Sequence, residues 1–135
     1  MPKLIRHDLL FPELSYQIIG ACFDSFNEIG PGQKENRYQT ILSMQLQKRQ
    51  ILFKEQHVIS IQSEQHEIGT HRLDFLIDEK IPLEIKIGNR FRERDFQQLA
   101  SYLATSKLQL GILVRFGTNG VIFRRILNPK NIRIS

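Results

Sequence analysis

Cysteine is scarce in this chain of 135 residues, and long apolar runs are absent. Cys22 is the only cysteine, which excludes an internal disulfide and a cysteine-based zinc cluster. Because it lies among apolar positions at helical spacing, the sequence predicts a buried structural thiol. No apolar run approaches the roughly 18 residues of a membrane span, and the first residues lack the apolar core and cleavage site of a signal peptide. We therefore expect a cytoplasmic protein without a membrane partner.

Several motifs that mark enzymes are also missing. The sequence has no phosphate-binding glycine loop, no serine–histidine nucleophile pattern, and no HxH or HExxH spacing. His57, His66 and His71 fall around two predicted strands, and we expect them in loops or on the surface. The stronger candidates are acidic and basic side chains.

The predicted elements form one α/β domain over residues 1–135, with a hydrophobic content of 41% that suffices for a packed core. Apolar residues three and four apart predict helices over about residues 15–30, 33–50 and 94–107, the first with Ser15 as N-cap and Gly30 as its end. Runs of β-branched and aromatic residues predict strands over about residues 51–62, 72–78, 81–87, 108–117 and 121–127. No repeat or linker divides this order.

Charge is distributed unevenly along the chain. Before Gly88 there are ten Lys or Arg and twelve Asp or Glu, a net of −2, whereas from Gly88 onward there are nine and two, a net of +7. A basic part joined to a part rich in carboxylates suits a protein that holds a polyanion and acts on it elsewhere. A solvated basic face explains the charge equally well.

The segment RLDFLIDEKIPLEIK, residues 72–86, alternates apolar and charged positions as two strands of a hairpin do. A turn centred on Glu79 would place Asp74 opposite Glu84, and directly opposed like charges destabilise a strand pair. A cation between them would remove this cost, and oxygen ligands suit Mg²⁺ or Mn²⁺. The alternative is an ordinary ion pair between Asp74 and Lys86, with Glu84 in solvent. Pro82 cannot donate in the ladder and indicates a strand edge or a bulge.

A second motif precedes the hairpin. In GPGQKENRY, residues 30–38, Gly32, Glu35 and Tyr38 form a GxxExxY pattern that places Glu35 and Tyr38 on one face of a helix. Together with RLDFLID, PLEIK and QLASYL, this pattern resembles the GxxExxY family of the PD-(D/E)xK nuclease superfamily. The similarity covers nearly the whole sequence, with Arg115 at a position where the family commonly has asparagine.

The resemblance implies a mixed β-sheet flanked by helices on both sides, the restriction-endonuclease-like core. It also implies a site in which Asp74, Glu84 and Glu35 bind the metal and Lys86 is the lysine of the ExK signature. Gln98 matches a glutamine of the following helix that would position Lys86 or a phosphate.

Two function classes follow. The first is a metal-dependent nuclease of DNA or RNA, in which the ion polarises the phosphate and Lys86 acts on the attacking water. The second is a binding or regulatory module that keeps the fold and basic surface without turnover. Arg90, Arg92 and Arg94, or Arg124 and Arg125, would contact nucleic acid phosphates. Because so small a chain has little room for a recognition domain, sequence specificity would require a homodimer or a protein partner.

Overall fold

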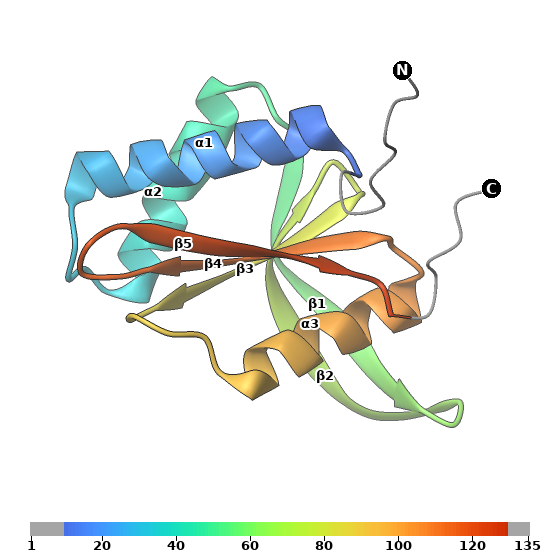
Figure 1. The fold of residues 1–135 in the computed structure, drawn as a ribbon. Coiled ribbons are helices and arrows are strands. Elements are labelled where there is room, and N and C mark those ends of the chain that lie inside the picture. The colour runs from blue at the N-terminus through green and yellow to red at the C-terminus, as the bar shows by residue number, and fades with distance from the viewer. Residues whose placement is uncertain (1–9, 130–135) are drawn as a thin grey trace, which may run out of the picture.

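A computed structural model describes residues 10–129 and shows a five-stranded sheet between helices (Figure 1). The elements in chain order are α1 (Pro12–Ile29), α2 (Glu35–Lys48), β1 (Phe53–Ser63), β2 (His66–Ile77), β3 (Ile81–Ile87), α3 (Glu93–Ser106), β4 (Leu110–Phe116) and β5 (Val121–Leu127). The strands lie in sequence order, and the β3–β4 pair is parallel whereas the other three pairs are antiparallel. This mixed sheet with helices on both faces confirms the predicted fold class and element order.

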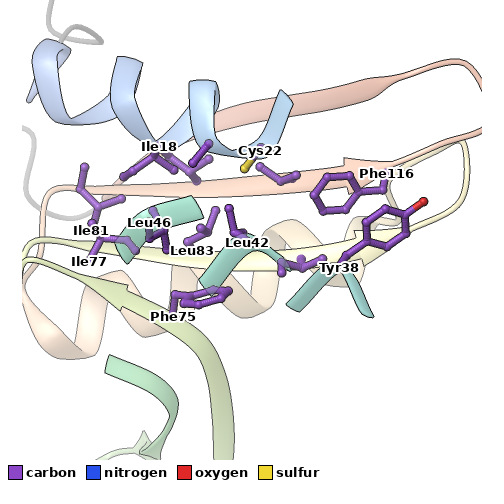
Figure 2. Close-up of a cluster of buried hydrophobic side chains, with 14 of the residues drawn as sticks. Ile18, Cys22, Tyr38, Leu42, Leu46, Phe75, Ile77, Ile81, Leu83 and Phe116 are labelled. Carbon is purple, nitrogen blue, oxygen red and sulfur yellow. The ribbon is translucent and has the colours of Figure 1, made fainter. Parts of the chain in front are cut away.

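One face of the sheet packs against α1 and α2. Its core includes Ile18 and Cys22 of α1, Leu42 of α2 and Phe75 of β2, all completely buried (Figure 2). The complete burial of Cys22 confirms the predicted buried thiol, and this burial raises the pKa of the thiol to about 12. In the part of the chain that the structure describes, no helix is long and apolar enough to span a membrane.

The other face packs against α3. Leu99 and Tyr102 of α3 contact a smaller cluster that includes Leu73, Leu76 and Leu113 of the sheet. α3 connects β3 to β4, which run parallel. The chain must return from the end of β3 to the start of β4, and α3 makes this crossover connection over this face of the sheet.

Two local predictions are wrong. α1 begins at Pro12 after Phe11, so Ser15 is a buried helix residue and not the N-cap. Proline is favoured in the first helical turn because the backbone amides there have no intrahelical hydrogen-bond acceptor, so its missing N–H is not needed.

Pro82 lies inside the sheet, opposite Leu76, rather than at an edge or bulge. It is tolerated because the ladder between β3 and β4 begins only at Leu83, after the proline.

The β2–β3 hairpin has the predicted register, but its ladder is short. Ile77 pairs with Ile81, Leu76 with Pro82 and Phe75 with Leu83, after which the pairing stops. Asp74 and Glu84 therefore follow the last paired residues directly.

β2 also changes its packing at Asp74. Leu73 belongs to the α3 cluster and Phe75 to the α1–α2 cluster, although residues two apart in a regular strand share a face. On the neighbouring strand, the pairing skips from Glu55 to His57, and Gln56 between them has a left-handed φ of 51°. This irregularity frees Asp74 from regular pairing beside the site.

Candidate active site

A cleft of about 490 Å³ opens where the parallel strands β3 and β4 end. Ligands commonly bind at the carboxyl ends of parallel strands, where loops and helix termini converge. The cleft is lined by Glu35 of α2, His71 of β2, Lys86 and Ile87 of β3, Arg92, Arg94, Asp95 and Gln98 at the start of α3, and Arg115 of β4.

Asp74 and Glu84 are held together by reciprocal hydrogen bonds with the backbone. The Asp74 amide donates to Glu84 Oε1 at 2.8 Å, and the Ile85 amide donates to Asp74 Oδ2 at 2.8 Å. These bonds continue the hairpin where the ladder has stopped, and they place the two carboxyl groups side by side. Burial, followed by the charge of Glu84, raises the pKa of Asp74 to about 7.

The simple ion-pair alternative for this hairpin is wrong. Glu84 is only 4% exposed, and the ion pair of Lys86 is with Asp95 rather than with Asp74. Glu84 is therefore buried and Asp74 partly buried, and neither forms an ion pair with Lys86.

Glu35 comes to the same region from the first turn of α2. The segment before it is fixed because the Tyr38 hydroxyl donates to the Gly30 carbonyl at 2.7 Å, while the Tyr38 ring stacks on Phe116 at 4.2 Å. Partial burial raises the pKa of Glu35, with Lys86 opposing the rise and Glu84 adding to it. The structure thus brings Glu35 and Lys86 to one cleft, as predicted from the sequence.

Asp95 joins two basic residues that neighbour each other in the sheet. Lys86 of β3 and Arg115 of β4 are paired positions, and like charges at such positions repel. Asp95 Oδ1 lies 3.7 Å from Lys86 Nζ, and its Oδ2 accepts a hydrogen bond from Arg115 Nη2 at 2.8 Å. Oδ2 also accepts from the Arg92 amide at 3.0 Å, which fixes the first turn of α3.

Arg115 is largely buried in this arrangement. Its guanidinium also donates to the Ile87 carbonyl and lies 4.9 Å from the centre of the Phe91 ring. Burial lowers the pKa of Arg115, and the neighbouring Asp95 opposes that shift.

Sequence reasoning missed Asp95 and Arg115 as site residues. Arg115 is the only charged residue in the otherwise apolar strand β4, whose residues are all buried. A buried charge requires a partner, so this pattern could have indicated an acid nearby. The identity of the acid could not be read, because Asp95 is also an ordinary first-turn residue of a helix.

His71 was expected in a loop or on the surface, and this prediction is wrong. Its Nε2 lies 2.7 Å from Glu84 Oε2, and the side chain is only 18% exposed. The alternation of side chains along a strand could not predict this contact, because the irregularity of β2 at Asp74 changes which side chains face the cleft.

The predicted nucleic-acid contacts lie in different places. Arg92, Arg94 and Gln98 line the cleft, whereas Arg90 is exposed outside its lining. Arg124 lies on the α3 face, 5.5 Å from the centre of the Phe91 ring. Arg125 lies on the opposite face, where it donates to Ser15 Oγ at 2.6 Å and to the Leu10 carbonyl at 3.0 Å. The structure therefore separates Arg125 from the cleft.

Comparison with known families agrees with this geometry. The family model described as "PD-(D/E)XK nuclease superfamily" matches residues 12–126, which include every element of the fold except the last residue of β5. This chain belongs to the PD-(D/E)xK nuclease superfamily. No curated protein matches it. The solved structure "Crystal structure of SSO0001" is similar to this PD-(D/E)xK domain, with a TM-score of 0.54 and 20% identity. The match covers 72% of this chain and 52% of that chain, so the domain spans about half of that protein and shares its fold.

PD-(D/E)xK nucleases typically use divalent metals, and the donor chemistry here can be compared with that requirement. Within residues 10–129, no group of three or more His, Cys, Asp or Glu side chains is arranged to hold a metal ion. Mg²⁺, however, is usually bound by one or two carboxylates, with waters and substrate phosphates as its other ligands. The adjacent oxygens of Asp74 and Glu84 fit this open type of site in number and chemistry.

Proposed function

We propose that this PD-(D/E)xK domain is a metal-dependent nuclease that hydrolyses phosphodiester bonds of DNA or RNA. The observation that carries the proposal is the hydrogen-bonded pair Asp74 and Glu84, which lies directly behind His71 of the basic cleft lined by Lys86. We further propose that the domain belongs to the GxxExxY family, which the Glu35–Tyr38 pattern supports. We also propose that it acts in the cytoplasm and that its partner is a nucleic acid.

In this proposal Asp74 and Glu84 hold Mg²⁺ or Mn²⁺, and Glu35 provides a third carboxylate. The ion, when bound, polarises a phosphoryl oxygen and lowers the pKa of a bound water. His71 supports the site by fixing the orientation of Glu84 through its contact with Oε2.

The remaining residues act on the substrate itself. Lys86 lines the cleft and would stabilise negative charge that develops on the phosphate during the reaction. Arg92 and Arg94 would bind phosphates on either side, and Gln98 would donate a hydrogen bond to a phosphate oxygen. Asp95 keeps Lys86 at the cleft rather than against the neighbouring carboxylates.

A cleavage assay tests the proposal. Purified protein is incubated with single- and double-stranded DNA and RNA, in Mg²⁺ or Mn²⁺ and in EDTA. We expect cleavage with metal only, and a loss of roughly 10²-fold or more in Lys86→Ala and Glu84→Gln, the usual scale for losing an electrostatic or acid–base group. Lys80→Ala, which removes an exposed lysine from the same hairpin, should retain full activity.

Cleavage that persists unchanged in both Lys86→Ala and Glu84→Gln would identify a contaminating nuclease. The domain would then be a nucleic-acid-binding module that retains the nuclease fold.

A further inference from the structure

A second hollow of about 320 Å³ continues from the cleft along α3. The two hollows share His71, Arg94 and Gln98, so they lie next to each other. We call the second hollow the α3 groove, because its sides come from α3 and from β1 and β2. Its volume lies at the lower end of the roughly 300–1,000 Å³ typical of ligand pockets.

The chemistry of the α3 groove differs from that of the cleft. Ile59, Ile61 and Tyr102 give it an apolar surface, and Gln97, Ser101 and Thr105 add neutral hydrogen-bonding groups. The lining contains no acidic residue, and Arg94, at the boundary with the cleft, is its one Lys or Arg. A ligand suited to both hollows is therefore anionic in the cleft and uncharged in the groove, with an apolar surface and hydrogen-bonding groups.

Arg94 lies where the cleft and the α3 groove meet, so its side chain can contact both parts of such a ligand. Its side chain is exposed at the boundary, and within residues 10–129 it makes no hydrogen bond or ion pair. A guanidinium can bind a phosphate and also stack on the face of a nucleobase.

We infer that the α3 groove binds an unstacked nucleobase next to the phosphate in the cleft, which makes single-stranded nucleic acid the substrate class. The inference rests on the proposed nuclease function and adds a base subsite to it. In a duplex the faces of the bases are covered by stacking, so only a single strand or an unpaired end presents a base to this groove.

Fluorescence anisotropy in EDTA tests the inference on the full chain. The probes are a labelled single-stranded DNA oligonucleotide, a strand of the same length whose residues are all abasic, and the corresponding duplex. We expect the intact single strand to bind about tenfold or more tightly than the abasic strand, the scale of a base contact, and more tightly than the duplex at matched salt.

A variant that fills the groove provides the second readout. Ser101→Trp places a large side chain at an exposed groove position and should reduce binding of the intact strand to the abasic level, while binding of the abasic strand stays unchanged. Thr40→Trp adds the same bulk at an exposed position of α2, outside both hollows, and should bind as the wild type does.

The outcomes separate the two proposals. Equal binding of intact and abasic strands by the wild type, or preference for the duplex, would overturn the base subsite and leave the nuclease proposal in place. No binding to any of the three probes would overturn the base subsite, and the cleavage assay with metal then decides the nuclease proposal independently.

Discussion

Asp74 has interactions that act on its charge in opposite directions. The Ile85 amide stabilises the carboxylate, whereas burial and Glu84 oppose ionisation more strongly and raise the pKa of Asp74 to about 7. An unperturbed aspartate has a pKa of about 3.9, so the folded protein binds this proton more tightly than the unfolded chain does. The contribution of Asp74 to the free energy of unfolding should therefore fall as pH rises from about 4 to about 7, and then stay constant.

Asp74→Asn should stabilise the metal-free protein at pH 8 by on the order of 1–4 kcal/mol, and by less at pH 5. The amide oxygen of asparagine can still accept from the Ile85 amide, so mainly the charge is removed. Urea denaturation in EDTA at the two pH values measures the difference. Asp78→Asn, in the turn of the same hairpin, should show no comparable effect, and equal stability of Asp74→Asn and wild type at pH 8 would contradict the raised pKa.

At the scale of elements, the carboxylate of Asp95 links α3 to the sheet through hydrogen bonds. Asp95 binds the α3 backbone at Arg92 and the side chain of Arg115 in β4. Removing one member of a buried ion pair leaves the other charge without compensation, which costs about 3–5 kcal/mol in comparable cases.

Asp95→Ala should therefore lower the free energy of unfolding by about 3–5 kcal/mol, as measured by urea denaturation. Adding Arg115→Met should recover part of this loss, because the uncompensated charge is then removed as well. Glu93→Ala, at an exposed acid in the same helical turn, is the matched control and should cost far less. Equal losses for Asp95→Ala and Glu93→Ala would show that the buried pair contributes little.

The segment that leads into α3 provides a test of the phosphate contacts. Replacing both Arg92 and Arg94 with Gln should flatten the slope of log affinity against log salt by about 1.4 on single strands, or 0.7 for each lost contact. Arg90→Gln removes an exposed arginine outside the cleft lining and should leave the slope nearly unchanged. The same slopes for wild type and the Arg92, Arg94 double variant would exclude these residues as phosphate contacts.

The features predicted correctly are those fixed by local sequence. The register of the β2–β3 hairpin follows from alternation and from the turn at Glu79, and both signals lie within the hairpin itself. The contacts of Asp95 and His71 depend on how α3 and the irregular part of β2 approach β3. Such approaches are set by packing between distant segments, which periodicity does not encode.

At the scale of the molecule, binding of a metal should stabilise the whole domain. A ligand that binds only the folded state raises the free energy of unfolding by mass action, by about 2.7 kcal/mol at a hundredfold excess over Kd. The wild type should therefore melt at a higher temperature with Mg²⁺ or Mn²⁺, and more so with an oligonucleotide whose phosphates complete the metal's ligands.

Asp74→Ala and Glu84→Ala should abolish most of that increase in thermal melting experiments, whereas Asp78→Ala in the hairpin turn should retain it. A calorimetric titration without metal binding at millimolar concentration, with and without oligonucleotide, would contradict the proposed metal site.

The reciprocal bonds between Asp74 and Glu84 also bear on the order in which the chain folds. The two residues are only ten positions apart, whereas Glu35 and Asp95 reach the site from other elements. Contacts close in sequence form with little loss of chain entropy, so we expect the hairpin to form before the cleft is complete. Repulsion between its two carboxylates would then be present already in the folding transition state, and the folding rate should be faster at mildly acidic pH than at pH 8.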